Sequence, residues 1–143
     1  SGRLDPTYSY VKKIEEALSR LTKHEEKEAK DIMCEKIYSV KKDEKIRNIV
    51  NLMEKYEISQ VLVEKNSNFI GLVTERALLG LDTINLMEKK ASDVMIESPP
   101  VVDLHAKLGI VVGLLKFYPL VLVKENVKIV GVVTKSDVIK SLK

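Results

Sequence analysis

The sequence predicts an α+β fold of two β-α-β-β-α repeats, packed with pseudo-twofold symmetry and preceded by an N-terminal helix. Short motifs occur twice in the same order, and each copy alternates extended and helical hydrophobic patterns. A chain of 143 residues suffices for one compact domain or two small ones that share a core. A unit of about 50 residues buries too little surface to be secure alone. We therefore expect the two repeats to pack together and to leave a ligand cleft between them.

The duplication rests on three motif pairs. AKDIM at 29–33 returns as ASDVM at 91–95, VLVEK at 61–65 returns as VLVKE at 121–125, and GLVTERAL at 71–78 returns as GVVTKSDV at 131–138. Three matches in one order indicate an internal repeat. We divide the chain into an N-terminal helix and linker over 1–28, a first repeat over 29–80 and a second repeat over 91–143.

Each repeat shows the same expected order of elements. A β-branched segment at 38–40 or 100–102 precedes a helical pattern that begins near Ile46 or Leu108. Two hydrophobic strands follow, joined by a tight polar turn at 65–68 or 124–128, and a short helix comes after the threonine. Runs such as QVLV and LVLV are apolar throughout, as expected for strands covered on both faces.

The N-terminal residues predict an amphipathic helix from about Pro6 to Leu21, with Asp5 as its N-cap. The charged stretch that follows reads as an exposed connector. S-G-R-x-x-P and a helix ending in EEAL are similar to the end of Cro/Xre-type helix-turn-helix domains, and a generic linker helix is the alternative. The resemblance implies a truncated prokaryotic transcriptional regulator, which would bind DNA only through the missing N-terminal domain.

Composition and cysteine usage limit the possible functions. Lys and Arg number 24 against 21 Asp and Glu, so the net charge of +3 gives little attraction to nucleic acid or membranes. One cysteine, no leader and no long apolar run predict a cytoplasmic protein without membrane association. His24 and His105 lack spaced metal-ligand partners, and Cys34 reads as a small core residue. We expect no enzyme, no catalytic residue and no metal.

The motif GVVTKSD carries the candidate binding chemistry. Asp137, on the first turn of a helix, can accept both hydroxyls of a ribose. Thr134 and Ser136 lie where backbone N–H groups can bind phosphate oxygens, and Lys135 adds positive charge. The alternative is a helix cap, since Thr134 and Asp137 have the spacing of a capping box.

The repeated D-h-M entry, the ISQVLV strand and the G-h-h-T-x-x-D close resemble the cystathionine-β-synthase (CBS) domain, here as a tandem pair or Bateman module over about 29–143. The resemblance implies a regulatory module that senses an adenosyl ligand, namely AMP, ADP, ATP or S-adenosylmethionine, between the copies. It also implies a homodimer of CBS pairs and no catalytic cofactor. A ligand-free structural dimerisation module is the alternative function.

The resemblance also implies which residues complete the two sites. The adenine pocket for Asp137 would consist of residues with apolar, aromatic or hydroxyl side chains: Tyr38, Ser39, Ile58, Ser59 and, on the floor, Val132. Ala77 stands where the first copy should carry the ribose acid. We therefore predict one principal site and one weak or vacant site. The weak site would draw on Thr74, Arg76, Val101, Tyr118 and Pro119.

Overall fold

The computed structural model describes residues 12–13, 15–16, 27–82 and 84–143. These divide into two compact units: unit 1 comprises the described residues up to 37 together with residues 99–143, and unit 2 comprises the described residues between 38 and 98. Each unit combines one sheet with several helices, which confirms the predicted α+β class. None of the helices in the described part of the chain has the length and apolar character of a membrane span.

Most of the predicted N-terminal helix lies outside the described residues, and so does most of the segment similar to a helix-turn-helix domain. Residues 12–13 and 15–16, which fall within that helix, are helical. The resemblance of this segment to a DNA-binding domain stays a prediction.

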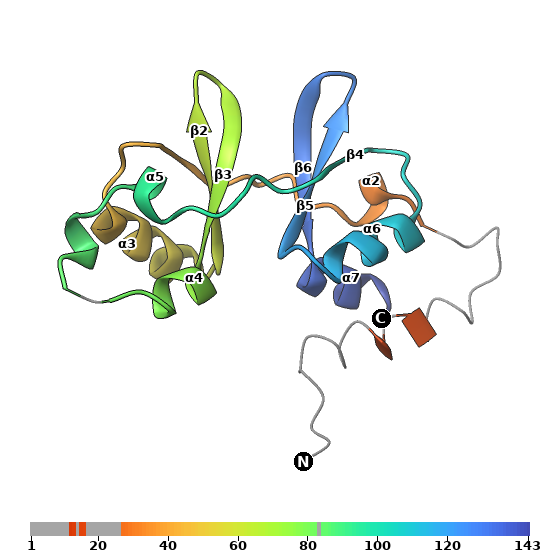
Figure 1. The fold of residues 1–143 in the computed structure, drawn as a ribbon. Coiled ribbons are helices and arrows are strands. Elements are labelled where there is room, and N and C mark those ends of the chain that lie inside the picture. The colour runs from red at the N-terminus through yellow and green to blue at the C-terminus, as the bar shows by residue number, and fades with distance from the viewer. Residues whose placement is uncertain (1–11, 14, 17–26, 83) are drawn as a thin grey trace, which may run out of the picture. The chain divides into compact units, whose positions relative to one another are not determined.

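Unit 2 contains a three-stranded sheet of order β1-β2-β3, in which β1 runs parallel to β2 and β3 runs antiparallel to it. Figure 1 labels the β2–β3 hairpin of this sheet. Its strands are β1 (Ser39–Lys41), β2 (Gln60–Lys65) and β3 (Asn68–Thr74), and its helices are α3 (Ile46–Tyr56), α4 (Glu75–Leu79), the 3-10 helix η2 (Leu86–Glu88) and α5 (Ala91–Val94). The core forms where the apolar side of α3 meets alternate residues of β2 and β3: Ile46, Ile49, Met53, Val61, Val63 and Val73.

Unit 1 repeats this plan with the order β4-β5-β6. Its strands are β4 (Val101–Asp103), β5 (Leu120–Glu125) and β6 (Lys128–Thr134), and its helices are α2 (Ala29–Ile32), α6 (Leu108–Leu115) and α7 (Lys135–Ser141). The core again joins a helix to alternate strand residues, here Leu108, Val111, Leu115, Val121, Val123 and Val133. The predicted order of strand, helix, strand, strand and helix is therefore found in both units.

The hairpin turns explain the polar residues between the paired strands. Asn66 and Ser67 have φ values of 51° and 67°, and Asn126 in the other hairpin has a φ of 57°. Asparagine tolerates this left-handed region better than most residues, and such turns match the twist of an antiparallel pair. The tight turns predicted from the sequence are confirmed.

The entry segment of each repeat lies in the unit formed by the strands of the other repeat. AKDIM forms α2 in unit 1, where the Ala29 N–H donates to the Ala106 carbonyl at 2.8 Å. ASDVM forms α5 in unit 2, where the Ala91 N–H donates to the Glu44 carbonyl at 2.8 Å. The sequence repeats and the compact units thus divide the chain at different points.

This placement of each entry segment in the unit of the other repeat explains why a methionine and a glycine recur in both copies. A Cβ atom built on Gly131 would lie 2.6 Å from Met33 Sδ, and one built on Gly71 would lie 2.5 Å from Met95 Sδ. The methionine that ends each entry motif therefore packs on the glycine that opens the G-h-h-T motif of the other copy. Any larger residue at the glycine would displace that methionine.

The prediction that Cys34 is a small core residue is wrong. Its N–H donates to the Val132 carbonyl at 2.8 Å, and the Val132 N–H donates back to the Cys34 carbonyl at 3.0 Å. This isolated bridge holds the backbone of the entry segment against β6, and the residue itself is exposed.

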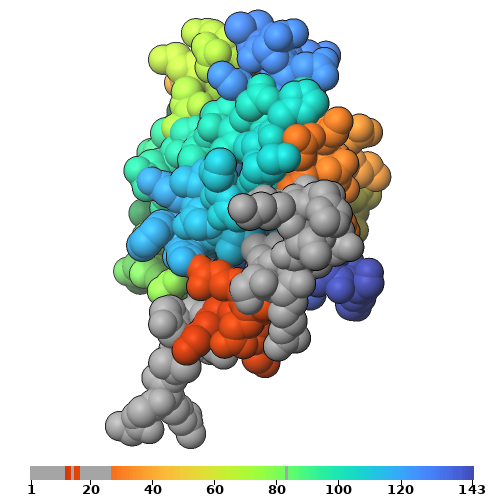
Figure 2. Space-filling model, turned by 90° about the vertical axis from the view of Figure 1, so that its right-hand side faces the viewer, coloured from red at the N-terminus to blue at the C-terminus, as the bar shows by residue number. Residues whose placement is uncertain are grey.

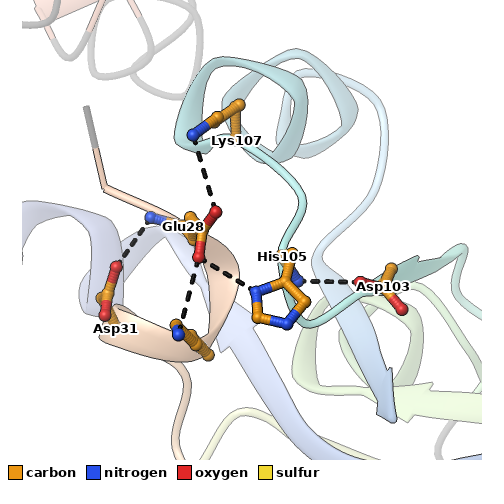
Figure 3. A network of polar contacts seen from close by, with 6 residues as sticks. Glu28, Asp31, Asp103, His105 and Lys107 are labelled. Atoms are coloured by element: carbon orange, nitrogen blue, oxygen red, sulfur yellow. Dashed lines mark hydrogen bonds and ion pairs between the residues drawn. The ribbon is translucent and has the colours of Figure 1, made fainter. Parts of the chain in front are cut away.

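A polar network secures the start of the entry segment in unit 1 (Figure 3). Glu28 Oε1 lies 3.1 Å from His105 Nδ1, and Glu28 Oε2 lies 3.5 Å from Lys107 Nζ. The hydrogen bond with His105 and the positive charges of His105 and Lys107 hold the pKa of the Glu28 carboxyl below its ordinary value, against a smaller effect of desolvation. The Glu28 N–H also donates to Asp31 Oδ2 at 2.9 Å, which caps α2.

Candidate functional site

In unit 1, the residues of the G-h-h-T-x-x-D motif lie at the edge of the sheet where β5 begins and β6 ends. Leu120, the first residue of β5, pairs with Thr134, the last residue of β6. Tyr118 and Pro119 immediately precede Leu120, and α7 immediately follows Thr134. The structure therefore brings Tyr118 and Pro119 next to the start of α7.

Val101 joins the same edge through β4. The Leu122 N–H donates to the Pro100 carbonyl at 2.8 Å, and Val101 pairs with Leu122 in parallel register. Val101 is half exposed, with 47% of its surface accessible, so it offers an apolar surface there. Three residues predicted for the weak second site thus share unit 1 with Asp137.

The Asp137 carboxylate caps the helix on which it lies. The Thr134 N–H and the Thr134 hydroxyl each donate to Asp137 Oδ2, at 2.9 and 3.0 Å. In return, Thr134 Oγ1 accepts from the Asp137 N–H at 3.4 Å. These reciprocal bonds form a capping box, with aspartate in the place where glutamate or glutamine is more usual.

The cap leaves part of the carboxylate available. Among the described residues, both bonds that Asp137 accepts go to Oδ2. An ionised carboxylate has about four lone-pair positions. The two positions on Oδ1 can therefore still accept the two hydroxyls of a vicinal diol, so capping and ligand binding are compatible. Asp137 is half-buried, which keeps it accessible to a ligand.

The remaining predicted residues of unit 1 lie close to this carboxylate in the chain. Ser136 is exposed on the first turn of α7, and Lys135 opens that helix. Val132 is in β6, where it pairs with Leu122 and also bridges to Cys34. The first turn of one short helix therefore carries an ammonium, a hydroxyl and a carboxylate on three consecutive residues.

Unit 2 has the corresponding edge with different chemistry. The Glu75 N–H donates to the Ser59 carbonyl at 2.9 Å, which places Ile58 and Ser59 beside the start of α4. The Leu62 N–H donates to the Tyr38 carbonyl at 3.0 Å, so the beginning of β1 reaches the same edge.

Tyr38 forms an aromatic pair with Tyr56 at the end of α3. The Tyr38 ring packs against Tyr56 with a centroid separation of 4.8 Å and an interplanar angle of 36°. Lys55 Nζ lies 5.2 Å from the centroid of the Tyr56 ring. This group presents an aromatic surface with an adjacent cation.

The N-terminus of α4 has fewer capping bonds than that of α7, because residue 77 is alanine. Thr74 Oγ1 accepts from the Ala77 N–H at 3.0 Å, as Thr134 does from Asp137, but alanine has no carboxylate to return the bond. Thr74 is buried, and Arg76 is exposed beside it. The edge of unit 2 therefore retains a capping threonine and a cation and lacks the acid.

The predicted sites combine residues from both units. The pocket predicted for Asp137 uses Tyr38, Ser39, Ile58 and Ser59, which belong to unit 2, whereas Asp137 belongs to unit 1. That pairing stays a prediction. Within unit 1 alone, the structure groups Asp137 with Val101, Tyr118 and Pro119.

Sequence reasoning missed a groove on the helical side of unit 2. The groove has a volume of about 730 Å³ and is lined by residues of α3, α4, η2 and their connections: Val50, Met53, Glu54, Glu57, Ile58, Ser59, Glu75, Leu78, Leu79, Leu81, Leu86 and Met87. Only Ile58 and Ser59 were among the predicted site residues. The apolar residues at 78–81 and 86–87 are the sequence signal, because a helix of five residues cannot bury them all.

The CBS-domain family model matches residues 29–83 and 91–143. Similar solved structures include a Methanocaldococcus jannaschii protein proposed as an archaeal homologue of g-AMPK, with 17% identity, a TM-score of 0.78 and coverage of 94% of this chain and 53% of that chain. A Vibrio cholerae protein proposed to act in acetoin utilization has 21% identity, a TM-score of 0.70 and coverage of 80% and 89%. A conserved Pyrococcus horikoshii protein has 20% identity, a TM-score of 0.70 and coverage of 80% and 90%.

At these identities, the similarity shows a shared fold and no more. A comparison with curated proteins found no match.

Proposed function

The chain belongs to the CBS-domain family as a tandem pair, and from this premise we propose that it is a regulatory module that binds an adenosyl ligand, with Asp137 holding the ribose. The observation that carries the proposal is the position of the Asp137 carboxylate at the sheet edge of unit 1. One oxygen caps α7 and the other keeps its acceptor capacity. A charged acceptor that is already fixed by its own helix binds a diol without a further loss of side-chain freedom.

The neighbouring residues supply the other chemistry that an adenosyl group needs. Tyr118, Pro119 and Val101, which we predict for the weak second site, also lie at this edge and offer aromatic and apolar surface. Ser136 offers a hydroxyl, and Lys135 offers a positive charge for a phosphate or a carboxylate. We expect Tyr38, Ser39, Ile58 and Ser59 to complete the pocket from the other unit. AMP, ADP, ATP and S-adenosylmethionine share the adenosine that this arrangement recognises.

The unit 2 edge should bind such a ligand more weakly. Hydrogen bonds to a charged group contribute about 1.5–3 kcal/mol, which corresponds to about one to two decades in affinity. Ala77 cannot make them, so one principal site per chain is expected.

A thermal shift measurement separates this function from a ligand-free dimerisation module. Ligand at about 100 times its dissociation constant stabilises the folded state by about 2.7 kcal/mol. AMP, ATP and S-adenosylmethionine should be tested in parallel. Stabilisation by at least one of them supports ligand sensing, and an unchanged melting temperature with all three supports the scaffold.

Asp137→Asn tests the residue itself, and Asp93→Asn is its matched control. Asp93 caps α5 by accepting from the Lys90 N–H at 3.0 Å, in the same box geometry but away from the sheet edge. Asparagine keeps an acceptor for the cap and removes the charge. We expect Asp137→Asn to weaken binding of the stabilising ligand by about one to two decades and Asp93→Asn to leave it unchanged. Equal affinity in wild type and Asp137→Asn contradicts the assigned role.

The output of the module is proposed from residues 1–28, which lie outside the family match. Their similarity to the end of a helix-turn-helix domain suggests that ligand binding controls a DNA-binding domain upstream. A coupling of about 1–3 kcal/mol is enough for such control. Operator binding by the complete protein, measured with and without the ligand, tests this step, and identical affinities contradict it.

A further inference from the structure

The entry segment of the first repeat docks on unit 1 through backbone hydrogen bonds. The Ala29 and Lys30 N–H groups donate to the carbonyls of Ala106 and Leu104, both at 2.8 Å. Figure 2 shows the result on the surface, where orange atoms from the start of the first repeat lie against turquoise atoms from the segment that contains β4 and the start of α6. These bonds involve only the main chain, so they do not depend on which side chains the segment carries.

The entry segment of the second repeat docks on unit 2 through the same backbone bonds. The Ala91 and Ser92 N–H groups donate to the carbonyls of Glu44 and Lys42, at 2.8 and 3.0 Å. The acceptors lie two and four residues before α3, as those of unit 1 lie two and four residues before α6. The backbone therefore gives neither unit a means of distinguishing one entry segment from the other.

The side chain just before each entry helix does distinguish them, because its charge is reversed. Glu28 is the N-cap of α2, and Lys90 is the N-cap of α5. In unit 1, Glu28 Oε1 lies 3.1 Å from His105 Nδ1, and Glu28 Oε2 lies 3.5 Å from Lys107 Nζ (Figure 3). In unit 2, Lys90 Nζ lies 3.7 Å from Asp43 Oδ1.

His105 and Asp43 occupy equivalent positions in the two units. Each stands three residues before the first residue of the main helix, Leu108 in unit 1 and Ile46 in unit 2. We call Glu28 with His105 the docking pair of unit 1, and Lys90 with Asp43 the docking pair of unit 2. The two docking pairs thus have the same place and opposite polarity.

The other charged groups of unit 1 reinforce its polarity. Lys30 Nζ also lies near Glu28 Oε1, at 3.8 Å, and Lys107 keeps its positive charge when His105 is neutral. Asp103 bonds to the backbone instead, because its Oδ2 accepts from the His105 N–H at 2.9 Å. Glu28 therefore faces a positively charged receptor.

The same position in unit 2 is negatively charged despite the lysines around it. Lys45 corresponds to Lys107, but its Nζ lies 2.9 Å from Glu88 Oε2, so an acid compensates this cation. Lys42 Nζ lies 3.4 Å from Asp43 Oδ1, on which Lys90 also acts. Asp43 remains the group opposite the entry segment.

An entry segment on the wrong unit would meet a like charge. Glu28 in unit 2 would face the Asp43 carboxylate, and Lys90 in unit 1 would face Lys107 and protonated His105. Like charges placed opposite each other suppress a wrong pairing even where all other contacts are equal.

We propose that the reversed docking pairs determine which entry segment each unit binds. Unit 1 selects the acidic segment that begins the first repeat, and unit 2 selects the basic segment that begins the second. The inference goes beyond ligand sensing and does not depend on it.

Amide hydrogen exchange of the full chain, followed by NMR at about pH 6, measures the docking of each segment by itself, and this pH favours the charged form of histidine. Glu28→Lys should lower the protection factors of the Ala29 and Lys30 amides at least about threefold and leave the docking amides of unit 2 unchanged. Glu125→Lys is the matched control, because it makes the same charge change at an exposed residue of the same unit. A loss in Glu28→Lys no larger than in this control overturns the proposal.

A compensating change separates charge from a general loss of structure. Glu28→Lys combined with His105→Asp gives unit 1 the polarity of unit 2, so it should recover about half or more of the lost protection on a logarithmic scale. Glu28→Gln removes the charge without reversing it and should lie between wild type and Glu28→Lys. A double variant no better protected than Glu28→Lys contradicts selection by charge.

Lys90→Glu tests the other unit and keeps the proposal testable if Glu28→Lys does not fold. It should lower the protection of the Ala91 and Ser92 amides. The factor should be smaller than in unit 1, because the side chains of Lys90 and Asp43 are 56% and 60% exposed, against 23% for Glu28. Unchanged protection of both amides also overturns the proposal.

Disulfide trapping reads the position of the first entry segment directly. Cys34 and Val132 exchange N–H donors and carbonyl acceptors, so Val132→Cys brings two cysteines to a separation that a disulfide can bridge. In that background, Glu28→Lys with Lys90→Glu exchanges the two charges and keeps the net charge constant. The intramolecular disulfide should form at least about threefold more slowly than without the exchange. An equal rate is incompatible with docking pairs that select their segments.

Discussion

Gly131→Ala is the sharpest test of the way in which the entry segment packs. The new Cβ would lie 2.6 Å from Met33 Sδ and 3.1 Å from the Cys34 carbonyl oxygen. Met33 can rotate away, but the Cys34 backbone is bonded to Val132 in both directions and must move as a unit. Overpacking of this kind costs about 1–3 kcal/mol. In a domain of about 150–250 residues, each kcal/mol lowers the melting temperature by about 2–4 °C.

Thermal and urea unfolding followed by circular dichroism measure this loss. Gly113→Ala is the control, because a Cβ there meets nothing within 4 Å and the residue lies in α6. It should stabilise the protein by about 0.5–1 kcal/mol, since alanine favours a helix over glycine. The two glycine variants should therefore shift in opposite directions.

A double variant identifies the clash. Met33→Ala removes the sulfur, so the loss in Met33→Ala/Gly131→Ala should be smaller than the sum of the two single losses. Additive losses, or a Gly131→Ala variant that unfolds like wild type, refute the packing argument.

Three further predictions concern the cap, the core and the polar network. Ala77→Asp should complete the capping box on Thr74 and raise affinity at the weak site by about one to two decades; calorimetry that still finds a single site per chain contradicts this. Leu115→Ala should cost about 2–5 kcal/mol in urea unfolding, because Leu115 is 1% exposed in the core of unit 1, and a loss below about 1 kcal/mol would exclude tight packing there. The lowered pKa of Glu28 means that its ionised form stabilises the fold above pH 4.5 and that this stabilisation is lost as pH falls through the lower folded value. Glu28→Gln should therefore speed hydrogen exchange at the Lys30 amide at neutral pH, with the difference from wild type vanishing in acid; equal exchange rates at neutral pH would contradict the role of the network.

The fold class and the order of elements follow from the sequence because they depend on local patterns. The spacing of Ile46, Ile49 and Met53 marks one side of a helix, and the run from Val61 to Val63 marks a covered strand. The repetition of these patterns also identifies the tandem CBS pair before any tertiary contact is known.

The candidate site was predictable only in part. The spacing of Thr134 and Asp137 fits both a cap and a ligand site, and only the bonds to Oδ2 show that the cap exists while the other oxygen keeps its acceptor capacity. The groove of unit 2 also required the tertiary structure, because Met53, Leu78 and Met87 come from elements far apart in the chain.

By itself, the sequence determined the duplication, the order of strand, helix, strand, strand and helix in each repeat, and the presence of an acid at the last position of only one of the two G-h-h-T-x-x-D motifs, since each depends on residues close together in the chain. Only the tertiary structure decided that each entry motif packs on the sheet of the other repeat, that Met33 fills the space over Gly131 and that Cys34 is exposed. The physical reason is that two similar entry segments offer nearly the same local signals to two similar sheets. The choice between those sheets depends on packing and bonding between residues distant in sequence, such as Glu28 with His105.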